Sequence, residues 1–328
     1  MAVGLSAVPT FAAPWSPRSL PAHGAGKYWH GWKGVQKYFV FGDSYTTTGF
    51  NITMAQPSSS VPLGNPAYPG YTSSNGPNYV DYLTTQYNQS LVETYNLAYG
   101  GATVDSDLVA QYLPTVLDFR QQVNTEFFPY YVDKPAAKWT SSNSLFSAFF
   151  GINDVGNSYS AQNATLNTAI FKVYASLIDE LYHAGARNFL FLNVPPVNLS
   201  PGTSEQGAAA QALEAADIAD FNDRLAQMAY NLQYTYVDTT VFQFDTSRVF
   251  NQVLTNPASY PQTAGYKNTT DYCVAYENGT PAMNTFNTTC GVPVNEYFWL
   301  NTLHPTYPMQ NVIAQQIALQ LESGSFVS

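Results

Sequence analysis

Positive charge is scarce in this chain of 328 residues. Lys and Arg number 12 against 22 Asp and Glu, which gives a formal net charge of −10, and only 10% of the residues are charged. A protein that binds nucleic acid needs clustered Lys and Arg side chains to neutralise the phosphates. The sequence contains no such cluster. We therefore expect no nucleic-acid partner.

Long apolar runs and metal-binding side chains are also lacking. No run of roughly 18 apolar residues is present, so the sequence predicts no membrane-spanning helix and no membrane partner. The chain has four His, dispersed along its length, and two Cys. These are too few and too scattered to predict a metal site, since such sites cluster Cys, His and carboxylate ligands. We expect neither a metal nor another cofactor.

Several features favour a secreted, extracellular protein. Cys273 and Cys290 lie in a segment rich in Asn, Thr and Gly that has little else to order it, which favours a disulfide formed in an oxidising compartment; two buried free thiols are the alternative. The chain begins with MAVGLSAVPTFAAP, which resembles the end of a signal peptide without its positively charged start, or else is an ordinary terminus. Candidate N-glycosylation sequons begin at Asn51, Asn88, Asn163, Asn198, Asn268, Asn278 and Asn287.

Strand-like and helix-like segments alternate along the chain. Short apolar runs predict strands at 37–41, 94–98, 145–150, 189–194 and 234–237. Periodic apolar residues predict helices at 78–87, 107–128 (broken or kinked at Pro114), 166–184, 204–232 and 306–323. This alternation is typical of a parallel sheet covered by helices on both faces.

No internal repeat or linker divides this pattern. The composition changes near Gly34, so we expect an N-terminal extension over residues 1–35 and one domain over residues 36–328. We expect the protein to be a monomer.

Reactive side chains follow the predicted strands, where ligands of open parallel sheets bind. Ser44 follows the first strand in VFGDSYT, Gly101 follows the second in NLAYGGATVD, and Asn153 follows the third in FFGIND. His304 precedes the last helix in FWLNTLHPT. A hydroxyl, an unobstructed backbone amide, a side-chain amide and an imidazole are thus expected on one edge of the sheet.

These groups match the needs of acyl transfer. A serine requires a base within hydrogen-bond reach to attack at neutral pH, and histidine is the usual base. The backbone N–H groups of Ser44 and Gly101 and the side-chain amide of Asn153 could stabilise the oxyanion of a tetrahedral intermediate. The G-x-S-x-G signature of another serine hydrolase class is absent from the sequence.

The four segments together resemble the four motif blocks of the GDSL-type, or SGNH, serine hydrolases. They are GDSY at 42–45, the segment around Gly101, GIND at 151–154 and LHP at 303–305. The resemblance implies a three-layer α/β/α, flavodoxin-like fold with a five-stranded parallel sheet. It also implies Ser44 as nucleophile and oxyanion donor, Gly101 and Asn153 as further oxyanion donors, and His304 as base.

One position departs from the family pattern. Three residues before the histidine the family has an aspartate, and this chain has Asn301. The amide oxygen can still accept the Nδ1–H of His304 and fix its tautomer, but it supplies no negative charge to the imidazolium. The alternatives are a backbone carbonyl or another acid, and Glu296, Glu277 and Asp271 are the nearest upstream acids.

The narrower resemblance is to the secreted fungal acetyl esterases of carbohydrate esterase family 16. The aromatic lead-in to GDSYT, the late cysteine pair and YFWLNTLHPT carry it. It implies an esterase that removes acetyl groups from cell-wall (xylan-derived) oligosaccharides or small esters. A lipase or general carboxylesterase, and a catalytically impaired sugar-binding relative, are the alternatives. Trp29, Trp32, Trp299 and Tyr45 either line a sugar cleft or belong to the core.

Overall fold

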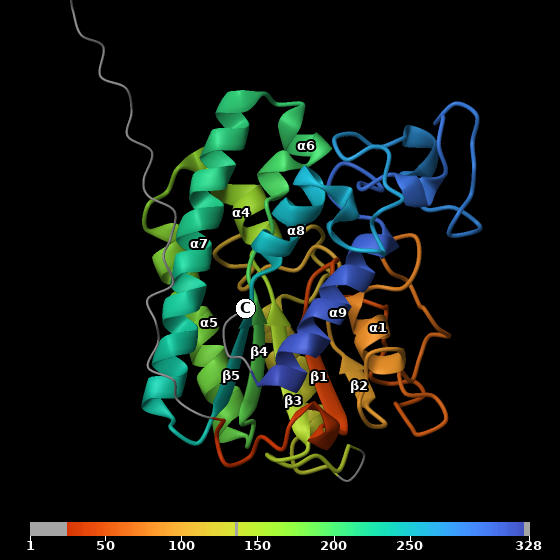
Figure 1. Ribbon diagram of the computed structural model, residues 1–328. Helices are drawn as coiled ribbons and strands as arrows, with labels where there is room; N and C mark the ends of the chain where they lie inside the picture. The colour runs from red at the N-terminus through yellow and green to blue at the C-terminus, as the bar shows by residue number, and fades with distance from the viewer. Residues whose placement is uncertain (1–24, 135–136, 325–328) are drawn as a thin grey trace, which may run out of the picture.

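Five parallel strands form the centre of the molecule (Figure 1). A computed structural model describes residues 25–134 and 137–324; the predicted signal-peptide remnant lies outside these ranges. The strands are β1 (Lys37–Gly42), β2 (Glu93–Asn96), β3 (Ser144–Phe149), β4 (Asn188–Leu192) and β5 (Thr240–Phe244). Their order in the sheet is β2-β1-β3-β4-β5, with every neighbouring pair parallel. The predicted five-stranded parallel sheet is confirmed.

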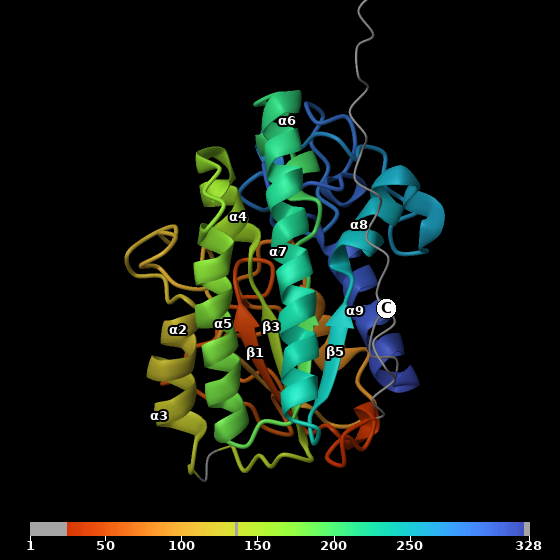
Figure 2. The same ribbon diagram turned by 90° about the vertical axis from the view of Figure 1, so that its left-hand side faces the viewer.

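Helices cover both faces of the sheet, which confirms the predicted three-layer fold. Figure 2 shows α2, α3, α5 and α7 over one face, and Figure 1 shows α1 and α9 over the other. The helices are α1 (Tyr79–Thr85), α2 (Phe119–Gln121), α3 (Phe128–Tyr131), α4 (Ile152–Ser158), α5 (Leu166–His183), α6 (Pro201–Ser204), α7 (Ala208–Thr235), α8 (Thr246–Thr255) and α9 (Tyr307–Ser323). Within the described ranges, no helix combines the length and hydropathy needed to cross a membrane.

Aromatic side chains of neighbouring strands stack in register within the core. Phe39 of β1 pairs with Tyr95 of β2 and with Phe146 of β3 in the strand ladder. Its ring stacks on both of theirs, with centroids 4.9 and 5.0 Å apart. Such contacts add to the large apolar area that each ring buries. Much of the aromatic content of this chain therefore serves packing.

One predicted helix is wrong in its first half, and one predicted strand is wrong. The segment 107–118 forms turns, and helical structure begins only at Phe119, where Asp118 accepts the Gln121 N–H in a capping box. A π-helical stretch, Gln122–Phe127, then joins α2 to α3. The predicted strand at 234–237 is the end of α7 and a turn, and the fifth strand is β5, at Thr240–Phe244. A tyrosine-rich helix end carries the same short apolar pattern as a strand, so periodicity alone could not separate them.

The described part of the predicted extension packs onto the sheet. Trp32 is buried and donates its indole N–H to the carbonyl of Tyr87 at 2.8 Å. The ring of Trp29 packs edge-on against Phe242, with centroids 4.8 Å apart. The predicted boundary after residue 35 stays a prediction.

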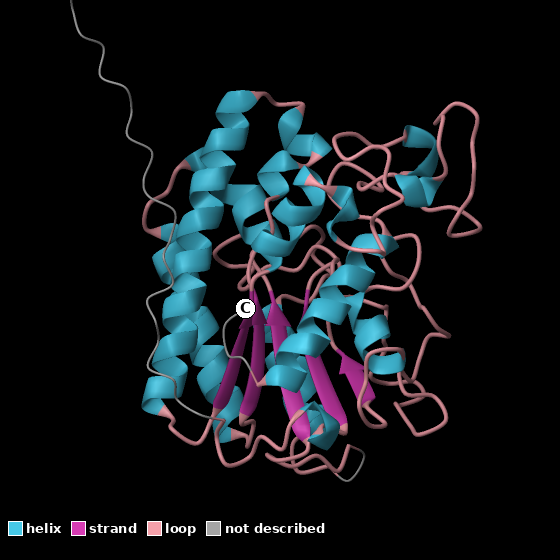
Figure 3. Cartoon of the chain, in the orientation of Figure 1, coloured by secondary structure: helices cyan, strands magenta, loops and turns pink. Residues whose placement is uncertain are grey.

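The carboxyl ends of the strands open into an irregular region. Loops gather above the arrowheads of the strands in Figure 3. The segment between α8 and α9 contributes most of this region, and it contains the predicted disulfide, which the structure forms between Cys273 and Cys290. The four predicted motif segments converge in this region, where Ser44, Gly101, Asn153 and His304 line one cavity.

Candidate active site

Ser44 lies in a tight turn directly after β1. The Asp43 carboxylate accepts the Tyr45 N–H at 2.9 Å, and its carbonyl accepts the N–H groups of Thr46 and Thr47. A side chain on Gly42 would collide with Thr46, because a Cβ there would lie 2.7 Å from the threonine hydroxyl. The glycine and the aspartate of the motif thus hold the turn that presents Ser44.

Two further segments bring amide donors toward Ser44. Gly101 has a φ of +82°, a left-handed conformation that favours glycine, and a Cβ there would lie 2.3 Å from the Cβ of Tyr112. Asn153, in the first turn of α4, donates from Nδ2 to the carbonyl of Ala102 at 2.9 Å. An amide nitrogen carries two hydrogens, so one N–H of Asn153 remains for another acceptor. Ser44, Gly101 and Asn153 line one cavity of about 530 Å³.

His304 connects this cavity to Asn301. Its Nε2 lies 2.7 Å from Oγ of Ser44, and its Nδ1 lies 3.0 Å from Oδ1 of Asn301. Both are within the distance that proton transfer and hydrogen bonding require. The structure thus brings the predicted serine, histidine and asparagine into one chain of hydrogen bonds.

The orientation of the Asn301 amide fixes the histidine tautomer. Its Oδ1 also accepts the backbone N–H groups of Leu303 and His304, at 3.1 and 2.9 Å. Its Nδ2 donates to the carbonyl of Glu277 at 3.3 Å. With the oxygen held toward the ring, Nδ1 must carry the proton, and Nε2 is left to accept from the Ser44 hydroxyl. This is the tautomer that a general base needs.

In the part of the chain that the structure describes, none of the three upstream acids forms a side-chain hydrogen bond to His304. Glu277 contacts the site through its backbone carbonyl, and its carboxylate accepts from the Asn278 side chain at 3.4 Å. Glu296 uses its carbonyl to accept two backbone N–H groups, and the Asp271 carboxylate accepts from Thr270 at 3.3 Å. Among the described residues, Asn301 is the partner of His304 Nδ1.

The surroundings keep His304 neutral. Burial lowers the pKa of His304 from 6.5 to about 4. An adjacent carboxylate would oppose this effect, because it favours the charged imidazolium. The free imidazole is therefore a competent proton acceptor over a wide pH range above about 4.

Two carboxyl groups of the motif blocks are buried beneath the site. One carboxylate oxygen of Asp43 accepts the Tyr45 N–H, and one carboxylate oxygen of Asp154 accepts the Val104 N–H at 3.0 Å. Burial raises the pKa of each to about 7, and the charge of Asp154 adds to the shift of Asp43. Both hold backbone segments in place, as turn and loop anchors do.

A second, larger cavity adjoins the first. It measures about 840 Å³ and shares Glu277, Asn278, Asn301 and His304 with the cavity at Ser44. The two cavities form one cleft.

The sequence did not predict the two exposed aromatic rings that line this cleft. Tyr71 is 76% exposed and lines the larger cavity, and Tyr112 is 77% exposed and lines the smaller one. Of the four candidates from the sequence, Trp32, Trp299 and Tyr45 are at most 1% exposed and belong to the core. The fourth, Trp29, is partly buried against the same core. Neither tyrosine lies in a motif, so only the fold could reveal them.

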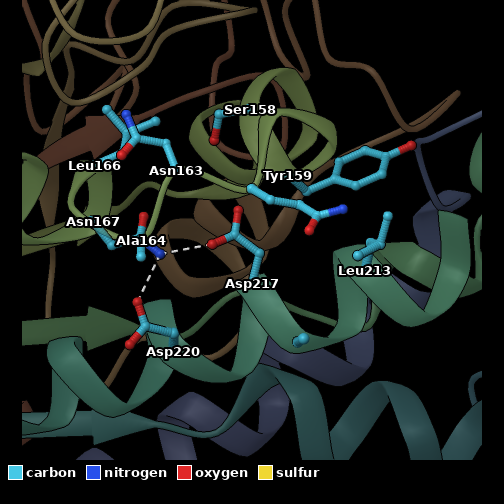
Figure 4. A pocket seen from close by; sticks show the side chains of 11 residues that line it. Ser158, Tyr159, Asn163, Ala164, Leu166, Asn167, Leu213, Asp217 and Asp220 are labelled. Atoms are coloured by element: carbon cyan, nitrogen blue, oxygen red, sulfur yellow. Dashed lines mark hydrogen bonds between the residues drawn. The ribbon is translucent and has the colours of Figure 1, made fainter.

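Another pocket, of about 340 Å³, lies between α5, α7 and the end of α4 (Figure 4). Asn167 donates to Asp217 at 2.7 Å and to Asp220 at 2.9 Å, and these are the dashed lines in Figure 4. The amide thus bridges two carboxylates of α7. The pocket is lined by neither His304 nor Ser44, and the hydrogen bonds of Asn167 join α5 to α7 there.

Comparison with known proteins gives one consistent family. Residues 38–317 match the family described as GDSL-like Lipase/Acylhydrolase. An acetylesterase of Thermothelomyces thermophilus is 36% identical over 294 residues, which cover 88% of this chain and 89% of that protein. A GDSL esterase/lipase of Arabidopsis thaliana is 24% identical over 324 residues, covering 86% of each. A crystal structure of an acetylxylan esterase from Geobacillus stearothermophilus superposes with a TM-score of 0.46 at 14% identity, covering 89% of this chain and 96% of that one.

The match spans most of the chain and includes every motif block described above. An acetylesterase at this level of identity over nearly the whole length of both proteins agrees with the acyl-transfer groups in the cleft. The chain belongs to the GDSL-like lipase/acylhydrolase (SGNH) family, and it is a carboxylic ester hydrolase.

Proposed function

We propose that this protein is a secreted carbohydrate acetyl esterase, of the kind found in carbohydrate esterase family 16, which removes O-acetyl groups from xylan-derived oligosaccharides. The observation that carries the proposal is the hydrogen-bonded chain from Ser44 through His304 to Asn301, which opens into a cleft beside Gly101 and Asn153. The 36% identity to a fungal acetylesterase supports an acetyl group as the acyl part.

Acylation begins with Ser44. Its Oγ attacks the carbonyl carbon of the acetyl ester while His304 Nε2 takes the hydroxyl proton. The C=O electrons move to oxygen, where the N–H groups of Ser44 and Gly101 and the free N–H of Asn153 stabilise the oxyanion. The tetrahedral intermediate then expels the sugar alkoxide, which takes the proton from His304. An acetyl-serine enzyme and a free sugar hydroxyl result.

Deacylation repeats the steps with water. His304 removes a proton from a water molecule, and the resulting hydroxide attacks the acetyl carbonyl. The second tetrahedral intermediate uses the same oxyanion donors. Its collapse returns the proton to Ser44 Oγ and releases acetic acid, which loses its own proton to the solvent as acetate. Asn301 holds the proton-bearing Nδ1 throughout, and the imidazolium forms without an adjacent carboxylate.

The acyl part is tested with p-nitrophenyl esters of increasing chain length together with acetylated xylooligosaccharides. We expect acetyl esters to be cleaved fastest, since each methylene beyond a full pocket costs roughly 1–3 kcal/mol of transition-state binding. Faster cleavage of octanoyl than of acetyl esters would move the assignment to a lipase. Binding of the sugars without any acetate release would indicate a catalytically impaired relative.

Secretion and glycosylation form part of the proposal. The disulfide supports an oxidising compartment, and of the candidate sequons Asn51, Asn163 and Asn278 are exposed. Expression of the full-length gene product in a fungal host, followed by mass spectrometry of the culture medium, tests both points. Retention of the protein inside the cells, with bare sequons, would contradict them.

A further inference from the structure

The two arms of the cleft differ in which catalytic groups they contain. The smaller arm contains Ser44, Gly101 and Asn153, whereas the larger arm reaches His304 and Asn301 but none of those three. The arms therefore serve different parts of an ester. The carbonyl oxygen must lie by the oxyanion donors, and the alcohol oxygen must lie by the group that returns a proton to it.

That proton comes from Nε2 of His304, so the alcohol extends past His304 into the larger arm. We infer that this arm, between residues 69–76 and 277–283, is the leaving-group subsite, and that Tyr71 is its specificity-determining residue, on which a neutral sugar ring stacks. This inference rests on the proposed acetyl esterase function and adds to it where the sugar binds and what binds it.

The position of Tyr71 suits a stacking platform. Its N–H donates to the carbonyl of Thr48 at 2.9 Å, and its ring lies against Gly49, where a Cβ would come within 2.7 Å of the ring carbon Cδ2. The ring is nevertheless 76% exposed. An aromatic ring that is braced on one side and open on the other can accept the apolar face of a sugar while its hydroxyl stays in water.

The charge of the arm favours a neutral ligand. Glu277 is the one acidic residue among its described lining residues, and Lys and Arg are absent from that lining. A phosphate or carboxylate on the alcohol would find no cationic partner there. The remaining polar groups are hydroxyls and amides, such as Thr72, Ser73 and Thr280, which suit sugar hydroxyls.

The two walls of the arm are tied together before any ligand enters. Asn75 donates to the Thr280 hydroxyl at 3.0 Å and accepts the Thr280 N–H at 2.6 Å. Asn75 has a φ of +56°, a conformation that asparagine tolerates better than most residues. The bridge fixes the width of the arm, and a fixed subsite loses less entropy when it binds a ligand.

The experiment compares two acetyl esters with different alcohols: an acetylated xylotriose, which fills the arm, and ethyl acetate, which is too small to reach Tyr71. We expect Tyr71→Ala to lower the ratio of kcat/KM on the sugar ester to kcat/KM on ethyl acetate by about tenfold, mostly through KM. Gly49→Ala strains the backbone, because Gly49 has a φ of +75°, and its Cβ displaces the Tyr71 ring. It should lower the ratio in the same direction.

Two variants of similarly exposed tyrosines serve as controls. Tyr112→Ala, on the acyl side, should change kcat/KM on both esters by the same factor. Tyr234 is 67% exposed and lies at the end of α7, just before β5, so it is at the amino ends of the strands and away from the cleft. Tyr234→Ala should leave kcat/KM on both esters unchanged. If Tyr71→Ala and Gly49→Ala both keep native melting curves and the wild-type ratio of the two kcat/KM values, the inference about Tyr71 is wrong, while the proposed esterase function is unaffected. Wild-type protein that cleaves ethyl acetate but not the sugar ester would overturn the proposed substrate as well.

Discussion

The floor and the wall of the cleft are held in different ways. The floor, which contains Ser44 and Asn153, follows β1 and β3, whose last residues are buried in the main core. The wall, residues 273–301, contains Asn301. Near its end Phe298 and Trp299 are buried in the main core. The rest of it packs on a separate small cluster of buried side chains: Tyr276, Cys290, Val294, Tyr297 and Leu300. One disulfide closes the loop above that cluster.

The two regions have different tasks: the floor places the reacting groups, and the wall shapes the cleft. The proposed nucleophile and oxyanion donors are placed by a buried sheet, so they should keep their geometry unless the whole domain unfolds. The part of the wall that depends on the small cluster and the disulfide can vary without unfolding the domain. The Glu277 carbonyl in this part accepts from the Asn301 amide. We therefore expect the wall to affect catalysis as well as the shape of the cleft.

Removing the nucleophile tests the floor most severely. Ser44→Ala should lower kcat on an acetyl ester by roughly 10⁴- to 10⁶-fold, because no other group can form the acyl-enzyme. The thermal midpoint should stay close to that of the wild type, since the deletion removes one hydroxyl and no apolar contact. Wild-type turnover in the purified variant would refute the assignment of the whole site.

The oxyanion donor from α4 should have the next largest effect. Asn153→Ala removes one donor and should lower kcat by roughly 10²- to 10³-fold with little change in KM. The matched control is Asn157→Ala on the same helix, where the amide donates to the Ala110 carbonyl at 3.2 Å and lies outside the cleft. Equal losses of kcat in the two variants would mean that helix stability, and not oxyanion stabilisation, explains the effect.

The floor was largely predictable from the sequence. Ser44, Gly101 and Asn153 each follow a strand-like run, and parallel strands all end at one edge of a sheet. Local pattern and topology together therefore placed them in one region. The spacing of the motif blocks then limited which residue of each loop faces the site.

Beyond its disulfide and Asn301, the wall was not predictable, because tertiary contacts and not local pattern decide it. The Glu277 carbonyl that orients Asn301, and the bridge between Asn75 and Thr280, join segments far apart in the chain with no periodic signal. Tyr71 belongs to a loop with the sequence of an ordinary polar turn, and Tyr112 belongs to a segment whose apolar pattern predicted a helix. The same limit explains the misplaced fifth strand, which depended on how α7 ended.

Asn301 connects the wall to the floor, because it bonds to the Glu277 carbonyl and to His304, whose other ring nitrogen lies beside Ser44. Asn301→Ala removes the acceptor of the Nδ1 proton and should lower kcat roughly 10- to 100-fold, because a hydrogen bond to a developing charge is worth about 1.5–3 kcal/mol. Asn301→Asp restores the acceptor and should keep kcat within about tenfold of the wild type. If neither substitution changes kcat, Asn301 is not the residue that orients His304.

The pH dependence distinguishes an amide from a carboxylate at this position. Burial lowers the pKa of His304 to about 4, so kcat/KM of the wild type should rise with pH through about 4 and then level off. In Asn301→Asp the carboxylate favours the imidazolium, so this limb should move to higher pH. An acidic limb near 6.5 in the wild type, unmoved by Asn301→Asp, would contradict the burial of the imidazole.

The disulfide should have the smallest effect on catalysis, and it tests how the wall acts. The double substitution Cys273→Ala and Cys290→Ala frees the loop that holds Glu277, so the Asn301 amide loses part of its orientation. We expect kcat to fall by a few-fold, less than in Asn301→Ala, and the loop to become sensitive to proteolysis, since closing a loop of about 15 residues is worth roughly 3 kcal/mol.

The decisive measurement is a double-mutant cycle. If the disulfide acts through Asn301, removing it in the Asn301→Ala background should leave kcat unchanged, because the contact that it supports is already lost. Full additivity of the two losses would show that the wall stabilises the transition state by another route. The same cycle with Asn153→Ala serves as the control. Asn153 rests on the main core, so the loss of kcat in Asn153→Ala should add to the loss of kcat caused by removing the disulfide.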